Sequence, residues 1–372
     1  MKNPKKNLLF ISNPFGYGPT GALIPVMQEF ASKTKYPITF LGSELCLELL
    51  KDIEIGGSFK IKEIDERNTL EIKKELLRTE EPYLISSLNR FAINAARSLN
   101  VPNALLDPLA WFWDKVPEGF EYTDIYLYNS FDKKIKQLGK ESIKIPLITS
   151  SFRESSLAPR VKQNIVFNLG GLSNPLVVEL PQNYLKVVHE LIDKIPVFYK
   201  KDIIVAGGKK AIEYLRALED EKNIFPMYRS FPYEKFAKII SNAKLIITPA
   251  GMGVSFSSIS LNKPTVIFLP ENLSQERLSY IFKKNKTLDS ILEWPNRYKK
   301  QLNTISEKEY IRSVDKVSKK ILNDKSQIKY LSSKLNNFIK TNLEKSTTTD
   351  KDKFVFGGEK VVFNVLVRKW NL

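Results

Sequence analysis

Short apolar runs alternate along the chain with longer stretches in which apolar residues recur every three or four positions. The short runs predict buried strands, and the three- to four-residue spacing predicts amphipathic helices. Alternation of the two patterns is typical of parallel sheets whose strands are joined by helices. In the N-terminal half the predicted strands are residues 7–11, 36–41, 83–86, 104–106 and 124–128, and the predicted helices include residues 22–33 and 89–99.

A second series of strands follows, predicted at residues 163–169, 202–205, 244–248 and 265–269, and each strand runs into glycine or proline. Residues 146–162 are polar, contain proline and lack periodicity, which is typical of a junction between domains. A chain of 372 residues is also longer than one core usually supports. We therefore predict an α/β fold of two doubly wound, Rossmann-like domains, residues 1–150 and 163–300.

The last part of the chain has a different pattern. One apolar stripe with helical spacing runs through Val314, Val317, Ile321, Ile328, Leu331, Leu335 and Phe338, with lysines between its members. This stripe predicts a long amphipathic helix. We expect residues 301–372 to form a helical tail that packs back on the domains, rather than a coiled-coil or membrane-surface helix, with a polar loop at residues 346–353.

Three strands of the second series end in glycine turns, which contain Gly170 and Gly171, Gly207 and Gly208, and Gly251 and Gly253. In parallel α/β sheets, ligands bind at the carboxyl ends of the strands. Glycine has no Cβ, so a phosphate can approach the backbone there. One such pair also fits an ordinary tight turn, but three on successive strands predict a site for an anionic group.

Composition narrows the choice of partner. The 58 Lys and Arg against 41 Asp and Glu give a formal charge of +17, which favours anionic partners such as nucleotides, nucleic acids or anionic lipids. The alternative is a lysine-rich surface without a particular partner. Because the chain has one cysteine, Cys46, and one histidine, His189, it has no intramolecular disulfide and no zinc-binding set. We predict no cofactor and no metal.

We expect neither a signal peptide nor a membrane span in this sequence. The apolar run at residues 8–11 is shorter than the ~7–15 residues of a signal-peptide core, and no later run reaches the ~18 residues of a membrane span. The sequence therefore predicts a cytoplasmic protein.

The segment GMGVSFSSISLNKPTVIFLPENLSQ, residues 251–275, resembles the donor-binding signature of GT-B glycosyltransferases. The resemblance is strongest to the peptidoglycan N-acetylglucosaminyltransferase and the small-molecule glycosyltransferases. The segments FPYEKFAKIISNAKLIITPAG (231–251), FNLGGLSNP (167–175) and NPFGYGPTGALIPVMQEFA (13–31) resemble other parts of the family, in the family's order. The resemblance thus covers most of residues 7–280, although each motif alone is loose.

This resemblance implies two domains facing across a cleft, and an inverting, metal-independent transfer of a sugar from a nucleotide-sugar donor to an unknown acceptor. The implied donor-binding residues are Gly170, Gly171, Gly251, Met252, Gly253, Ser257, Ser274 and Gln275. The predicted acceptor-binding residues are Gly16, Gly18, Thr20, Trp111 and Trp113, with Tyr17 nearby. Plain core packing is the alternative for the tryptophans. Arg229 or Lys209 is predicted to face the diphosphate.

Three positions depart from the family pattern. Ser257 stands where a carboxylate usually binds the ribose, Ser274 replaces an acid before the glutamine, and Ala22 replaces a histidine base. The predicted base is therefore Asp107, which follows a strand in the segment LLDPLAWFW, and its alternative role is that of a turn residue before Pro108. A protein that only binds a nucleotide or glycan, or a nucleotide-sugar hydrolase or epimerase, remains an alternative to a transferase.

Overall fold

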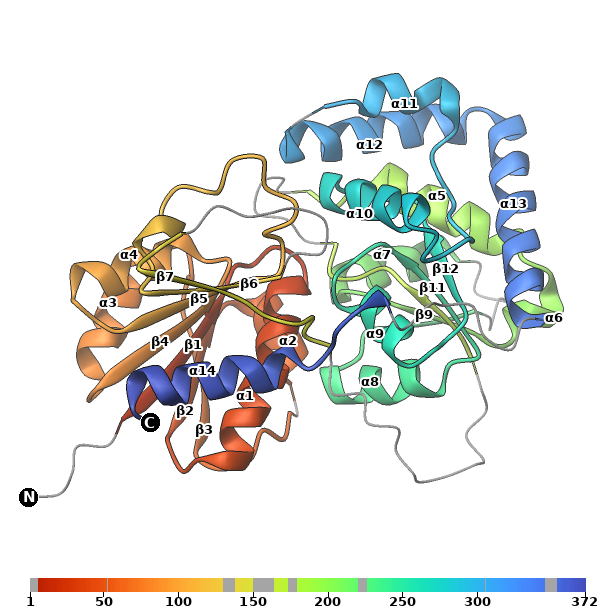
Figure 1. The fold of residues 1–372 in the computed structure, drawn as a ribbon. Helices are drawn as coiled ribbons and strands as arrows, with labels where there is room; N and C mark the ends of the chain where they lie inside the picture. Colours follow the sequence, from red (N-terminus) through yellow and green to blue (C-terminus); the bar gives the residue numbers. More distant parts are fainter. Residues whose placement is uncertain are drawn as a thin grey trace, which may run out of the picture. The chain divides into compact units, whose positions relative to one another are not determined.

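The computed structural model describes residues 6–51, 53–129, 138–149, 164–172, 179–219, 226–304, 306–344 and 353–372. The chain divides into two compact units (Figure 1). The first unit consists of Met1–Ser151 and Phe354–Leu372, and the second of Phe152–Lys353. Most of the predicted junction, residues 146–162, and of the predicted tail loop, residues 346–353, lies outside the described residues.

The first unit is built on a seven-stranded parallel sheet with the order β3-β2-β1-β4-β5-β6-β7. Its strands are β1 (Asn7–Ser12), β2 (Ile38–Gly42), β3 (Phe59–Glu63), β4 (Pro82–Ser87), β5 (Asn103–Asp107), β6 (Ile125–Tyr128) and β7 (Glu141–Lys144). All five strands predicted for this half are confirmed. The sequence missed β3 and β7, the two edge strands, because neither has a continuous apolar run.

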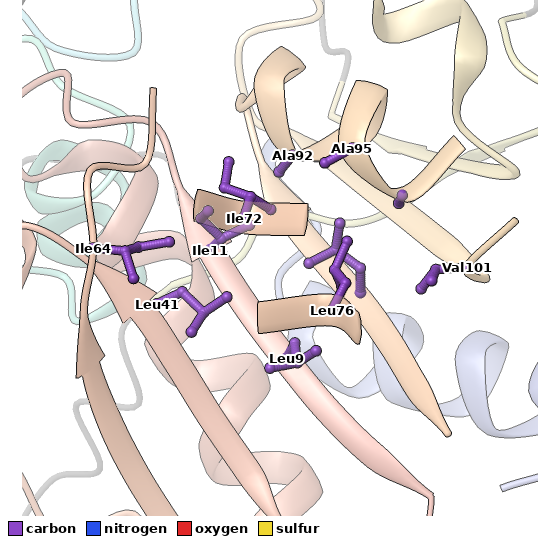
Figure 2. Packing of buried hydrophobic residues seen from close by; sticks show 11 residues of the cluster. Leu9, Ile11, Leu41, Ile64, Ile72, Leu76, Ala92, Ala95 and Val101 are labelled. Atoms are coloured by element: carbon purple, nitrogen blue, oxygen red, sulfur yellow. The ribbon is translucent and has the colours of Figure 1, made fainter. Parts of the chain in front are cut away.

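Helices cover both faces of this sheet. They are α1 (Gly18–Lys33), α2 (Glu44–Leu50), α3 (Thr69–Arg78), α4 (Arg90–Ser98), the short helix η1 (Phe120–Tyr122) and α14 (Gly358–Trp370). Figure 2 shows the core on the α3–α4 side, where Leu9 and Ile11 of β1 meet Ile72 of α3 and Ala92 of α4. Phe10, between them in β1, packs instead on Phe30 of α1 with ring centroids 6.1 Å apart, so successive residues of the strand face different helical layers.

The C-terminal helix α14 lies against α1 on the other side of the sheet. Phe363 packs edge-to-face on Phe30 with ring centroids 4.9 Å apart, and Trp370 contacts Tyr83 at 5.2 Å. Gly358 starts the helix where an added Cβ would lie 2.2 Å from the Pro146 carbonyl oxygen, so only glycine fits. Residues 354–372 therefore complete the core of the first unit.

The second unit is built on a five-stranded parallel sheet with the order β10-β9-β8-β11-β12. Its strands are β8 (Ile165–Asn168), β9 (Ile203–Ala206), β10 (Met227–Arg229), β11 (Leu245–Pro249) and β12 (Thr265–Phe268). The four predicted strands are confirmed. The sequence missed β10, a three-residue edge strand in which only Tyr228 is buried.

The helices of the second unit are α5 (Gln182–Asp193), α6 (Val197–Lys200), α7 (Lys209–Leu218), α8 (Tyr233–Asn242), α9 (Val254–Ser260), α10 (Leu273–Lys284), α11 (Asn296–Leu302), α12 (Glu307–Leu322) and α13 (Lys325–Glu344). The prediction of one helix along the C-terminal stripe is wrong, because the chain ends α12 at Leu322 and restarts as α13. Asp324 accepts hydrogen bonds from the backbone N–H and hydroxyl of Ser326, which stabilises a new helix start.

Within the described part of the chain, every helix is either too short or too polar to cross a lipid bilayer.

Candidate functional site

The strand order of the second sheet reverses between β8 and β11. From β8 the chain builds outward through β9 and β10 on one side, and β11 and β12 extend the sheet on the other. Such a switch point leaves a crevice at the carboxyl ends of the two central strands, where ligands bind in open α/β sheets. The turns after β8 and β11 are the two that carry Gly170 and Gly251.

Hydrogen bonds fix the floor of this crevice. The Asn168 side chain at the end of β8 donates to Thr248 Oγ1 of β11 at 3.0 Å, and its own Oδ1 accepts the Gly170 N–H at 3.2 Å. The Gly208 N–H donates to the Gly170 carbonyl at 2.9 Å, which joins the turn after β9 to the turn after β8. The structure thus brings the three predicted glycine turns together at one edge.

The physical cause that favours glycine differs from one position of these turns to the next. Gly170 has φ of +68°, in the left-handed region that favours glycine. Gly207 is tightly packed, because an added Cβ would lie 3.2 Å from the Leu169 Cβ. At Gly251 the nearest atom to an added Cβ is 4.0 Å away, and at Gly253 none lies within 4 Å. Neither backbone conformation nor packing within the described chain requires glycine at these two positions.

The other donor-binding candidates near Gly251 lie at different depths. Gly171 is buried, and Met252 is half-buried. Ser257 is completely buried in α9, and its Oγ has no hydrogen-bond partner among the described residues. In this conformation the Ser257 hydroxyl is therefore out of reach of a ligand. The Gly251 N–H is already engaged, since it donates to Ser255 Oγ at 3.1 Å.

Gln275 and Ser274 take part in the start of α10. Asn272 caps this helix by accepting the Gln275 N–H at 3.0 Å, and Gln275 Oε1 accepts the Glu271 N–H at 2.8 Å. The Ser274 hydroxyl donates to Asn272 Oδ1 at 2.9 Å. Both predicted donor-binding side chains are half-buried and take part in the hydrogen bonds that stabilise the start of α10.

The sequence analysis missed Glu271, which lies three residues after the end of β12 and is almost fully buried. Burial, with the neighbouring Glu307 carboxylate, raises the pKa of Glu271 to about 8. Burial also raises the pKa of Glu307 to about 7, while the backbone N–H groups of Leu273 and Ser274 lower it. The sequence did contain a signal for Glu271, because this residue follows Pro270 near the end of a predicted strand. Nothing in the sequence placed Glu307 beside it.

Of the cationic candidates, Lys209 is exposed on the first residue of α7, and Arg229 is exposed at the end of β10 with its guanidinium 5.5 Å from the Phe231 ring centroid. His189 lies on α5, where its Nε2 is 3.3 Å from Glu219 Oε1. The His189 side chain is therefore next to the Glu219 carboxylate and away from the three glycine turns.

In the first unit, Asp107 at the end of β5 is completely buried. Its Oδ1 accepts the Leu109 N–H at 2.8 Å, and its Oδ2 accepts the Trp113 indole N–H at 3.0 Å and the Tyr126 hydroxyl at 2.6 Å. Burial raises the pKa of Asp107 to about 6, while these donors lower it. To act as a base, Asp107 would have to exchange these partners for an acceptor hydroxyl.

The two tryptophans after Asp107 pack within the same loop. Trp111 is buried and its indole N–H donates to the Pro108 carbonyl at 3.1 Å. Trp113 is half-buried, and its ring meets that of Phe112 edge-to-face at 4.9 Å. The structure thus brings Asp107, Trp111 and Trp113 together as one hydrogen-bonded loop.

The remaining acceptor candidates lie in the loop between β1 and α1. Gly16 has φ of +58°, and Gly18 is exposed with no atom within 4 Å of an added Cβ. Thr20 is buried, with its Oγ1 2.7 Å from Ser12 Oγ. The Tyr17 hydroxyl donates to a Glu48 carboxylate oxygen.

A buried polar cluster below this loop was missed. Ser43 Oγ donates to Glu66 Oε1 at 2.7 Å, and Cys46 Sγ lies 3.7 Å from the same oxygen. Asn89 Nδ2 bridges the carbonyls of Ser12 and Glu66 at 3.1 and 2.9 Å. Burial and the Glu66 charge raise the pKa of the Cys46 thiol to about 11, which favours its neutral form over the reactive thiolate. The members come from four separate segments, which explains why no local motif predicted them.

Comparison with known proteins identifies the fold. No family model matches the chain, and no curated protein does. UDP-GlcNAc 2-epimerase from Neisseria meningitidis, bound to UDP-GlcNAc, is similar with a TM-score of 0.56 at 10% identity, over 98% of this chain and 100% of the other. S. aureus MnaA with UDP is similar with a TM-score of 0.55 at 12% identity, over 99% and 97%.

A UDP-glucosyltransferase from Polygonum tinctorium capable of glucosylating indoxyl is also similar, with a TM-score of 0.52 at 11% identity over 100% of both chains. Identities this low establish the fold alone. The chain has a GT-B type of fold with two Rossmann-like α/β domains, and the fold class predicted from the sequence is confirmed.

Proposed function

We propose that this chain is a glycosyltransferase that moves a sugar from a nucleotide-sugar donor to an acceptor. The donor diphosphate would bind at the switch point of the second sheet, against the backbone of residues 250–253. The observation that carries this proposal is the unexplained pair Gly251 and Gly253, where the chain itself leaves the space of a side chain open. A ligand phosphate that approaches the backbone is the physical reason that remains.

The distribution of charge supports an anionic ligand on this unit. Residues 152–353 contain 35 Lys and Arg against 21 Asp and Glu, whereas the rest of the chain contains 23 against 20. Most of the net charge of +17 therefore belongs to the second unit. A positive potential raises the local concentration of a nucleotide diphosphate around its binding site.

The similar structures suggest which nucleotide to try first. One contains UDP, one contains UDP-GlcNAc, and one is described as a UDP-glucosyltransferase. A uridine nucleotide is therefore the first choice for the donor, and Gln275 remains our candidate for contact with its sugar. We expect backbone N–H groups and nearby cations, rather than a metal, to stabilise the departing diphosphate.

The acceptor would bind the first unit, near Gly16, Gly18 and the loop of Trp111 and Trp113, and Asp107 remains the proposed base. Inverting transfer requires a base that removes the proton of the acceptor hydroxyl as the bond to the donor sugar forms. An ionised Asp107 is available at neutral pH, because its pKa of about 6 lies below 7. Its three internal hydrogen bonds would have to rearrange around the acceptor.

A nucleotide-sugar epimerase or hydrolase is the second candidate. It is favoured by the similarity to a UDP-GlcNAc 2-epimerase, whose TM-score of 0.56 exceeds the 0.52 of the glucosyltransferase. A protein that only binds nucleotides is the third, since Ser257 and Asp107 are both fully buried.

Titration calorimetry with UDP, UDP-glucose and UDP-GlcNAc tests the nucleotide site. We expect wild type to bind at least one of them and Gly251→Val to lose measurable binding, because the branched side chain would occupy the place of the phosphate. Gly21→Ala is the matched control, since Gly21 has the same open space around its Cβ position but lies in α1 of the first unit. Absence of binding by wild type at millimolar nucleotide would remove the main support for the proposal.

Proton NMR of the same mixtures separates the candidate reactions. Incubation of UDP-GlcNAc with the protein alone would produce a 2-epimer from an epimerase and free sugar from a hydrolase. A transferase would release UDP only when a suitable acceptor is added. A protein that binds UDP but changes none of these spectra, with any acceptor tried, would support the binding-only alternative.

A further inference from the structure

The short helix α6 exposes two neighbouring apolar side chains. Val197 and Phe198 are 67% and 65% exposed. The Phe198 ring packs only against its neighbour Tyr199, with ring centroids 4.0 Å apart, among the ring contacts of the described chain. Single exposed apolar residues are common on protein surfaces, but two large adjacent ones at a helix tip are a recognition feature.

Helix α13 packs against α5, the helix directly before this tip, and Figure 1 shows α6 next to one end of α13. Its Asn336 side chain donates to the Lys194 carbonyl at 3.0 Å, directly before α6. Lys329 and Lys340 are seven residues before and four after Asn336, so they lie on the same face of α13. Lys325 extends this face by one more turn. The face of α13 that meets the α5–α6 turn is thus a row of lysines.

These lysines are not neutralised by nearby acids. Lys201, Lys325, Lys329 and Lys340 are exposed, and none has an ion pair within the described residues. The acids of the neighbouring turn are already paired, since Asp193 lies 2.9 Å from Lys200 and Glu190 lies 3.8 Å from Lys194. Glu344 is the one exposed acid along α13.

We propose that this surface, formed by Val197, Phe198, Lys201, Lys325, Lys329 and Lys340 and called here the α6–α13 surface, binds an anionic lipid bilayer. Phe198 and Val197 would enter the head-group region, and the lysines would contact lipid phosphates. A nucleic acid duplex would also attract the lysines, but its bases are already stacked inside the helix and would gain little from an exposed Val–Phe pair. The apolar pair beside the lysine row therefore favours a bilayer. This inference is independent of the proposed enzymatic function.

Co-sedimentation of the full chain with lipid vesicles tests the proposal. We expect binding to vesicles of phosphatidylcholine mixed with phosphatidylglycerol and no binding to phosphatidylcholine alone. Raising the salt concentration should weaken binding, because screening shortens the range of the lysine–phosphate attraction. Failure to bind the mixed vesicles at low salt would overturn the proposal.

Two variants test the residues. Phe198→Ser should weaken binding by about tenfold or more, because it removes the larger apolar group. The double variant Lys329→Glu and Lys340→Glu should weaken it at least as much, because each lysine near an anionic surface contributes about fivefold and each reversal adds repulsion. Circular dichroism and thermal unfolding would verify that both variants are folded.

Leu77→Ser is the matched control, since Leu77 is 71% exposed but lies on α3 in the first unit. It should bind vesicles like wild type. Equal losses in Leu77→Ser and Phe198→Ser would overturn the assignment to the α6–α13 surface. Duplex DNA that displaces the vesicles and binds Phe198→Ser as tightly as wild type would also overturn it, in favour of a general polyanion site.

Discussion

Asp107 illustrates what a residue's position in the sequence conveys about its role. Its place after a short apolar run predicted a carboxylate at a strand end, and β5 does end at Asp107. Its hydrogen-bond donors were not predictable, because Trp113 is six residues away in an irregular loop and Tyr126 lies on the adjacent strand β6. The position of a residue at a strand end follows from the local sequence pattern, whereas its burial and its hydrogen-bond partners depend on contacts between separate segments of the chain.

These partners lead to a stability prediction for Asp107→Asn. The asparagine amide keeps the shape but replaces one acceptor oxygen by a donor, so the Trp113 indole and Tyr126 hydroxyl lose their shared acceptor. We expect the free energy of unfolding to fall by about 1–3 kcal/mol, the cost of leaving a buried polar group unpaired. Urea unfolding followed by tryptophan fluorescence would measure it.

The exposed Glu118 of the same loop region provides a control, because Glu118→Gln should change stability by less than about 0.5 kcal/mol. An Asp107→Asn protein with unchanged stability but collapsed turnover would contradict the anchoring role and support the proposed role as a base.

At the scale of elements, central strands were predictable and edges were not. Strands buried on both faces are continuous apolar runs, whereas β3, β7 and β10 contain charged or exposed residues. The break between α12 and α13 was missed because Ile321 and Ile328 stay in phase across it, seven residues apart. The start of α10 was predictable, because Asn272 followed three residues later by Gln275 is a helix-start pattern. We predicted instead that Gln275 contacts the donor sugar, because of the family resemblance.

The contact between the start of α10 and the first turn of α12 should make stability depend on pH. The pKa of Glu271 is raised by burial and by Glu307, from 4.5 to about 8, so the folded state favours its protonated form. The stabilisation from this shift is complete below pH ~4.5 and is lost as the pH rises through about 8. We expect the Tm of wild type to fall between pH 6 and 9 for this reason.

Glu271→Gln keeps the neutral form at every pH, so its Tm should fall less than that of wild type over the same range. Thermal unfolding by circular dichroism at several pH values would measure the difference. The control is Glu213→Gln, which lies on the exposed face of α7 and should follow wild type. Parallel Tm profiles for Glu271→Gln and wild type would contradict the prediction.

At the scale of the whole molecule, two series of strands predicted two α/β units, because each series can bury its own sheet between helices. The sequence did not show which unit holds the last helix. Residues 354–372 belong to the first unit through contacts such as Phe30 with Phe363, which are more than 300 residues apart in the chain. Amphipathic spacing predicts that a helix has a buried face, but the partner of that face depends on shape complementarity.

The last helix should therefore govern the stability of the first unit alone. Phe363 is 9% exposed and fills the space between α14 and α1, so Phe363→Ala should cost about 3–5 kcal/mol of unfolding free energy in this unit. Nucleotide binding by the second unit should persist at temperatures where the first unit has already unfolded. Val355→Ala is the matched control, because Val355 lies in the same C-terminal segment but is 72% exposed. Calorimetric scans with and without UDP would separate the two transitions, and one common transition that shifts as a whole in Phe363→Ala would show that the units unfold together.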